Sequence, residues 1–117
     1  MMTLDLNIES SRSGNILVIK LSGDLDDFNA QKAFSYLKSE IDKGIRRIVI
    51  DLDSIKFMDS IGLGVIVKTS KNIQDLGGKL IIVCSKPQII RLIDTSGLIK
   101  AKKIQVMEDL GKAIDII

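Results

Sequence analysis

The sequence predicts a mixed α/β fold: a mostly parallel sheet with an antiparallel hairpin at its N-terminal edge and about four helices. Three observations support this fold class. Segments 4–8 and 16–21 alternate polar and apolar residues on either side of a glycine-containing turn, as the strands of a hairpin do. Segment 46–52 is a compact β-branched run typical of an inner strand. Between the strand-like runs, apolar residues recur at helical spacing.

The N-terminal third predicts a hairpin followed by a helix. The strands Leu4–Ile8 and Ile16–Leu21 are joined by the turn Ser13-Gly14-Asn15, so they are expected to be antiparallel. In the segment Asp27–Lys43, Phe28 and four later apolar residues stand at helical spacing, and a glycine follows as a stop. We therefore expect Phe28 on the apolar face of the first helix.

The middle of the chain predicts a parallel crossover. The run Arg46–Leu52 is expected to form the central strand, with a loop over Ser54–Asp59 after it. A helix over Ile61–Gln74, stopped by Gly77-Gly78, leads to a strand over Lys79–Cys84. Strand, helix and strand of these lengths predict a right-handed connection between parallel neighbours.

The C-terminal third predicts a short helix, a short strand and a last helix. Pro87 suits the first turn of a helix over Pro87–Asp94, which closes at Thr95-Ser96-Gly97. A strand over Ile104–Val106 and a helix from Glu108 to the end complete the chain. Because linkers, repeats and low-complexity stretches are absent from the sequence, residues 1–117 are expected to form a single domain.

The composition argues against an enzyme. The chain has no histidine, which removes Ser-His and Cys-His nucleophiles and most transition-metal sites. Its one cysteine, Cys84, lies in a strand-like run and is expected to be a small residue of an aliphatic core. The segment Gly62-Leu63-Gly64 with Lys68 matches neither a phosphate loop nor a dinucleotide-binding pattern. We expect no catalytic residue, no metal and no cofactor.

Charge and hydropathy also exclude several partners. The net charge of +2 comes from interspersed residues, and one Tyr and three Phe offer little for bases to stack on, so we expect no nucleic-acid binding. The apolar runs are strand-sized, well below the roughly 20 residues that a membrane-spanning helix needs. The first residues lack the pattern of a secretory signal, so a cytoplasmic protein without a membrane partner is expected.

Ser60 is the main candidate for function. It stands where the N-cap of the second helix is expected, and the plainest interpretation is a cap whose loss would cost about 1 kcal/mol. Gly62 and Gly64 each cost that helix up to about 1 kcal/mol relative to Ala, which favours a bare turn that another chain approaches closely. A bare helix N-terminus with a hydroxyl at its tip would also accept a phosphoserine.

Acidic residues surround this candidate. Asp59 is adjacent, and Asp24, Asp26 and Asp27 end the second strand, at what is expected to be the same rim. An added phosphate of about −1.5 to −2 charges would repel them and any partner fitted to the neutral hydroxyl. For Asp24, Asp26 and Asp59 we favour solvated or capping roles over a Mg²⁺ site. We expect Asp26 to be a surface residue whose charge reversal leaves the fold intact.

The chain resembles the STAS-domain anti-sigma factor antagonists of bacteria, also called anti-anti-sigma factors, over nearly its whole length. The segment that follows the central strand is the most specific part of the resemblance, and it implies an STAS-like single domain. The matching residues are Leu21-Ser22-Gly23-Asp24-Leu25-Asp26, Ile48-Val49-Ile50-Asp51-Leu52, Phe57-Met58-Asp59-Ser60-Ile61-Gly62-Leu63-Gly64, Gly77-Gly78 and Thr95-Ser96-Gly97-Leu98.

This resemblance implies a phosphorylation switch at Ser60. In that family an anti-sigma factor, itself a serine kinase of the histidine-kinase-like ATPase type, phosphorylates the Ser that follows the Asp. The unphosphorylated form binds the anti-sigma factor and frees the sigma factor, and phosphorylation ends that binding. Many members have a second Ser or Thr where this chain has Ile61. The expected protein is a monomer when free, and its partner-binding residues are expected to be Asp24, Asp26, Asp59, Ile61, Gly62, Leu63 and Gly64.

Two other interpretations remain to be weighed. A phosphoacceptor receiver domain has an acidic pair, an acceptor Asp and a Lys-Pro pair, which Asp26-Asp27, Asp51 or Asp53 and Lys86-Pro87 imitate, but the spacing lacks one strand and one helix. The second alternative is an STAS subunit of a sensory or transporter complex that is never phosphorylated. A stand-alone chain with Ser at the acceptor position favours the sigma pathway.

Overall fold

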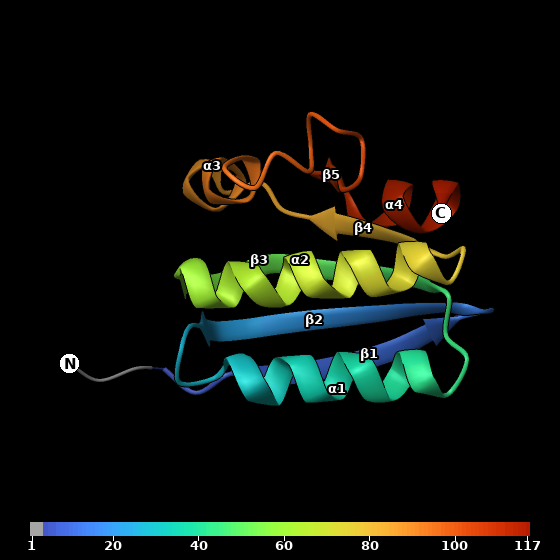
Figure 1. The fold of residues 1–117 in the computed structure, drawn as a ribbon, viewed down its shortest axis with the longest axis horizontal. Coiled ribbons are helices and arrows are strands. Elements are labelled where there is room, and N and C mark those ends of the chain that lie inside the picture. The colour runs from blue at the N-terminus through green and yellow to red at the C-terminus, as the bar shows by residue number, and fades with distance from the viewer. Residues whose placement is uncertain (1–3) are drawn as a thin grey trace.

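The computed structural model describes residues 4–117, which form one five-stranded sheet in the order β1-β2-β3-β4-β5. The first two strands pair antiparallel and all later neighbours pair parallel, which confirms the predicted fold class (Figure 1). The strands are β1 (Asn7–Ser13), β2 (Ile16–Leu25), β3 (Arg47–Met58), β4 (Lys79–Val83) and β5 (Gln105–Met107).

Helices cover both faces of this sheet. The long helices α1 and α2 lie side by side on one face, while α4 packs on the other face against β3, β4 and β5 (Figure 1). Within the described chain the helices are α1 (Ala30–Asp42), α2 (Ser60–Asp75), α3 (Pro87–Asp94) and α4 (Leu110–Ile116). The predicted bounds of the third helix are confirmed. No helix in residues 4–117 is both long and apolar enough to cross a membrane.

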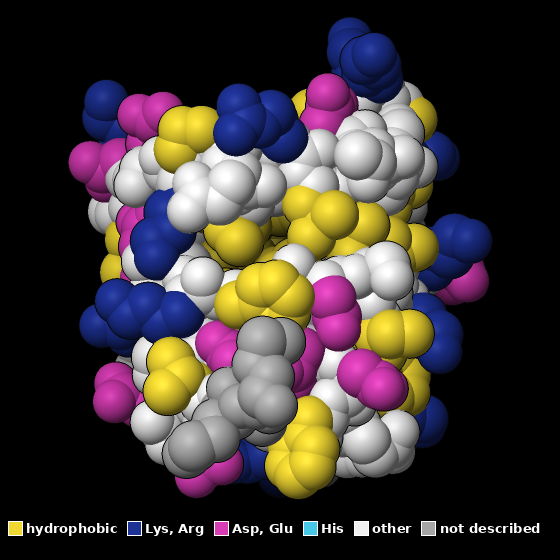
Figure 2. All heavy atoms as spheres, turned by 90° about the vertical axis from the view of Figure 1, so that its left-hand side faces the viewer, with side chains coloured by type: hydrophobic (Ala, Val, Ile, Leu, Met, Phe, Trp, Pro, Cys, Tyr) yellow, Lys and Arg dark blue, Asp and Glu magenta, His cyan; other side chains and the backbone are white. Residues whose placement is uncertain are grey.

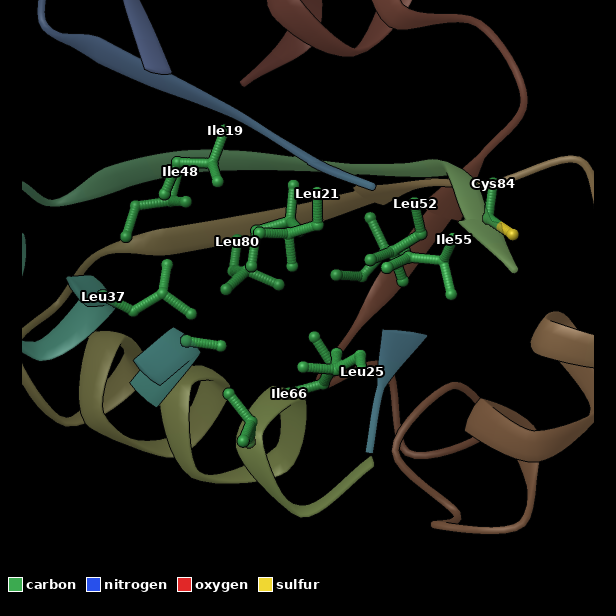
Figure 3. Packing of buried hydrophobic residues seen from close by; sticks show 14 of the residues in the cluster. Ile19, Leu21, Leu25, Leu37, Ile48, Leu52, Ile55, Ile66, Leu80 and Cys84 are labelled. Atoms are coloured by element: carbon green, nitrogen blue, oxygen red, sulfur yellow. The ribbon is translucent and has the colours of Figure 1, made fainter. Parts of the chain in front are cut away.

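The core is aliphatic, and β3 supplies side chains to both of its halves. Because successive residues of a strand point to opposite faces, Ile48 and Leu52 pack toward α1 and α2, whereas Val49 packs with Ala113 of α4. Figure 3 shows the larger half, in which the strand residues and Ile66 of α2 lie between the sheet and the helices. This burial on both faces agrees with the central place predicted for β3.

Several predicted strand bounds are wrong, because long-range pairing sets the strand ends: β2, expected to end at Leu21, runs to Leu25, and the bounds of β4 and β5 differ by one residue. β1 begins at Asn7 and runs to Ser13, since all seven of its residues pair with β2; its mostly exposed polar side chains give no alternating pattern. β3 continues to Met58 through most of the expected loop 54–59. There it pairs with the end of β2, with two register shifts at which β3 has the extra residue.

The parallel register brings two chain segments together at one end of the sheet. Leu25, the last residue of β2, pairs with Met58, the last residue of β3, so both strands end at the same edge. The loop to α1 leaves from the first strand and α2 begins directly after the second. The sequence prediction that these segments share one rim is therefore confirmed.

Cys84 directly follows β4, although the sequence prediction places it inside that strand, and is fully buried in the larger half of the core. Burial raises the pKa of its thiol, and the neighbouring Asp53 and Asp51 raise it further, against a hydrogen bond to the Lys86 carbonyl. The thiol therefore stays protonated at neutral pH, as a core residue would.

Candidate functional site

Ser60 is the exposed first residue of α2, not its N-cap. The N-cap is Asp59, which keeps the extended backbone of β3, and its Oδ1 accepts a hydrogen bond from the Gly62 N–H at 2.8 Å. Asp caps a helix as well as Ser does and adds a negative charge at the positive end of the helix dipole. The predicted cap is thus wrong by one residue. No hydrogen bond among residues 4–117 involves the Ser60 hydroxyl.

Asp59 also joins α2 to the loop that follows β2. Its Oδ2 accepts from the backbone N–H of Asp27 at 3.0 Å, and its own N–H donates to the carbonyl of Leu25 at 3.4 Å. The sequence offered no partner group for this carboxylate, yet both of its oxygens accept backbone hydrogen bonds. Asp59 therefore fixes the position of Ser60 relative to the neighbouring loop.

The two glycines in the first turns of α2, Gly62 and Gly64, have different surroundings. Gly62 is buried, and a Cβ added there would overlap the carbonyl oxygen of Leu25. The close approach is therefore between α2 and the end of β2 within the chain. A Cβ added at Gly64 would meet nothing within 4 Å. The expectation of a bare helix surface is correct for Gly64 and wrong for Gly62.

Asp24 and Asp26 are almost buried, each with 8% of its surface exposed. Asp26 Oδ1 accepts from the Asn29 N–H at 3.1 Å, and Asp24 Oδ2 accepts from the Leu4 N–H at 2.9 Å. The Asn29 side-chain amide donates to the carbonyls of Asp24 and Leu4, each at 3.0 Å. Together these bonds shape the loop between β2 and α1. The prediction that Asp26 is a surface residue is wrong.

Large hydrophobic side chains are exposed around this end of the sheet. Figure 2 faces that end and shows hydrophobic side chains gathered around acidic ones. Four of the six exposed large hydrophobic residues in the described chain belong here, and we call them the apolar rim: Leu4 (53%), Phe28 (79%), Phe57 (49%) and Ile61 (51%). Exposed apolar residues that gather in this way mark interaction surfaces more often than scattered ones do.

Phe28 corrects a second helix prediction. It lies in the turn before α1, which begins at Ala30, and its side chain points into solvent. The helical spacing of the sequence placed it on the buried face, but the hydrogen bond from Asn29 to Asp26 closes a turn there first. Leu63 differs from its neighbour Ile61, because Leu63 packs partly against the core. Of these three apolar residues, Phe28 and Ile61 are the ones available to a partner.

The family profile described as the STAS domain matches residues 7–113. The chain belongs to the STAS domain family. Among curated relatives, the anti-sigma F factor antagonist of Paenibacillus polymyxa is 35% identical over 106 residues, which cover 86% of this chain and 87% of the relative.

Solved structures share this STAS fold. An anti-sigma factor antagonist from Mycobacterium paratuberculosis superposes with a TM-score of 0.84 at 22% identity, covering 95% of this chain and 92% of that one. The anti-sigma factor antagonist SpoIIAA, in its unphosphorylated form, gives a TM-score of 0.75 at 20% identity, covering 95% and 96%.

A groove of about 260 Å³ lies beside Ser60 on this STAS domain. Its walls come from the N-terminal halves of α1 and α2, and the lining residues are Ala30, Gln31, Phe34, Ser60, Ile61, Gly64, Val65 and Lys68. The Lys68 ammonium lies 5.7 Å from the centre of the Phe34 ring, within the range of a cation–π contact. Sequence analysis missed this groove, because the packing of two separate helices forms it.

The acidic residues of this STAS domain do not form a metal centre. In residues 4–117, no three Asp, Glu or Cys side chains converge in a way that would hold a metal ion. Asp24, Asp26 and Asp59 instead accept backbone hydrogen bonds. The predicted site residues thus divide into three groups: Asp24, Asp26 and Gly62 are buried, Asp59, Leu63 and Gly64 are half-buried, and Ser60 and Ile61 are exposed to solvent.

Proposed function

We propose that the protein is an anti-sigma factor antagonist whose binding to an anti-sigma factor is switched off by phosphorylation of Ser60. The main supporting observation is an exposed hydroxyl that makes no hydrogen bond in the described chain and stands next to the apolar rim. The 35% identity to a protein named as an anti-sigma F factor antagonist supports the same class of activity. In this proposal the protein works by binding in the cytoplasm, and it catalyses no reaction.

The apolar rim is the proposed contact surface for the anti-sigma factor. Interfaces gather aromatic and aliphatic residues at a core with polar groups around it, and Phe28, Phe57 and Ile61 have that chemistry. Asp59, Gly62, Leu63 and Gly64 belong to the same surface in this proposal, as the turn that presents it. Asp24 and Asp26 contribute by holding the loop from β2 to α1 in shape.

The proposed switch acts on binding and leaves the fold intact. A phosphate on Ser60 would place about −1.5 to −2 charges beside Asp59 and the apolar Ile61. A partner that covers this surface would have to desolvate that charge, which weakens the complex. The fold tolerates the phosphate, because the first turn of a helix favours negative charge. Ser60 is proposed as the only residue whose modification switches binding.

The kinase in this proposal is the anti-sigma factor itself, and the antagonist is a monomer when free. The test is incubation of the purified chain with its anti-sigma factor, ATP and Mg²⁺, followed by location of the phosphate by mass spectrometry. Ser60→Ala should abolish incorporation. Ser39→Ala, which removes an exposed hydroxyl from α1, should leave it unchanged. Phosphate on another residue would refute the switch at Ser60. No phosphate at all would also refute it, and would favour an STAS subunit that is never phosphorylated.

A further inference from the structure

The groove beside Ser60 contains a single charged group. Of the eight lining residues only Lys68 is charged, and no salt bridge of the described chain includes it. Its ammonium lies over the Phe34 ring, and such a contact is weak at an exposed site. An anion in the groove would therefore attract this ammonium more strongly than the Phe34 ring does.

Ser60 lines the same groove as Lys68. It precedes Lys68 on α2 by just over two helical turns, with Gly64 between them. Gly64 has no side chain, and a Cβ added there would meet nothing within 4 Å, so position 64 leaves the space between the two groups open on the groove side of α2. Side chains of a helix lean toward its N-terminus, so the Lys68 stem leans toward Ser60.

We propose that, once Ser60 is phosphorylated, Lys68 leaves the Phe34 ring and forms an ion pair with the phosphate inside this groove. The inference rests on the proposed function, because that function supplies the phosphate. Charge-assisted hydrogen bonds from an ammonium to a phosphate are stronger than neutral ones. The phosphate is also tethered to the helix that bears the lysine, so its effective concentration near the ammonium is high.

Other charged or polar groups near the phosphate also act on its second pKa, but none of them changes when Lys68 is replaced. Asp59 and Asp27, from the strand end and the neighbouring loop, favour the less charged phosphate. The N–H groups of the first turn of α2 favour the dianion in every variant alike. On α1, Lys32 donates to the carbonyl of Leu6 at 2.6 Å, away from the groove lining. Replacement of Lys68 therefore removes the only cation among the residues that line the groove.

The test uses a chain with phosphoserine encoded genetically at position 60, so that no kinase is needed. The second pKa of the phosphate is read by ³¹P NMR titration. Lys68→Met removes the charge, keeps an unbranched side chain one atom shorter, and should raise that pKa by about half a unit or more, since loss of an opposite charge disfavours the dianion. Lys68→Arg should restore the original value. Lys71→Met, which removes another exposed cation of α2, should leave it unchanged.

The outcomes separate this inference from the function it rests on. If Lys68→Met and the unsubstituted chain titrate together, the ion pair is refuted, and labelling of Ser60 by the kinase still stands on its own. If the kinase never labels Ser60, the proposed switch fails, and the encoded phosphoserine still reports whether Lys68 pairs with a phosphate. An equal rise of the phosphate pKa in Lys68→Met and Lys71→Met would indicate an effect of general surface charge. That outcome would also refute the ion pair in the groove.

Discussion

Asp59 and Asp27 are joined across 32 positions of sequence, by a hydrogen bond of 3.0 Å from the Asp27 N–H to the Asp59 carboxylate. The other oxygen of the same carboxylate caps α2 through the Gly62 N–H. One side chain therefore sets both the start of the helix that bears Ser60 and the position of the loop beside it. The geometry of the proposed contact surface depends on this carboxylate.

Asp59→Ala should lower the free energy of unfolding by about 1–2 kcal/mol, the usual cost of a lost cap. It should also weaken binding to the anti-sigma factor, because the loop is no longer tied to the helix. Asp109→Ala is the matched control, since Asp109 caps α4 in the same way, by accepting from the Lys112 N–H at 2.9 Å. Chemical denaturation and calorimetry would check both. Equal loss of binding in the two variants would contradict a local role of Asp59.

Gly62→Ala and Gly64→Ala should change stability in opposite directions. A methyl group at position 62 overlaps the Leu25 carbonyl, so we expect a loss of about 1–3 kcal/mol from overpacking. A methyl group at position 64 meets nothing and replaces Gly in a helix interior, so a gain of up to about 1 kcal/mol is expected. Urea denaturation of the two variants checks this. The packing assigned to Gly62 would be disproved by a Gly62→Ala chain as stable as the parent.

Ser60→Ala should change the free energy of unfolding by less than about 0.5 kcal/mol, because Asp59 and not Ser60 caps the helix. The variant should still bind the anti-sigma factor. Ser60→Asp should keep the fold, with a helix dipole that favours its charge, and should bind more weakly. Thermal denaturation and a binding titration measure the two effects. Binding of Ser60→Asp as tight as that of the parent would contradict the proposed switch.

Asp26→Lys should destabilise the protein by about 1–3 kcal/mol, because it removes a nearly buried acceptor of the Asn29 N–H. Asp27→Lys is the adjacent control: its side chain is exposed, and its bond to Asp59 uses the backbone. That change should leave stability within about 0.5 kcal/mol. Melting curves of both variants decide the matter. Similar curves would show that the loop does not need the Asp26 carboxylate.

Ile61→Gln should weaken binding of the anti-sigma factor by about tenfold, as expected for loss of an apolar contact at an interface. Leu76→Gln is a matched control, because Leu76 is the C-cap at the far end of α2 and the exposed fractions of Ile61 and Leu76 are 51% and 50%. It should leave affinity unchanged. Titration of both variants with the partner checks the location of the contact surface, and equal affinities would move that surface away from Ser60.

Local patterns in the sequence determined the order of elements, the hairpin, the aliphatic core and the rim on which Ser60 lies. They succeeded because a buried strand such as Ile48–Leu52 and a helix start such as Pro87 are properties of neighbouring residues. The family resemblance, which the match to the STAS domain over residues 7–113 confirms, rests on the same continuous segments.

Only the tertiary structure decided how the site is built. The pairing of β3 with the end of β2 extends that strand to Met58 and leaves Asp59, not Ser60, as the cap. Contact with the Leu25 carbonyl explains Gly62, while Gly64 opens a groove toward Lys68. These features join residues some 30 or more positions apart, or two separate helices. Their partners are set by strand register and packing, which the periodicity of a single segment does not encode.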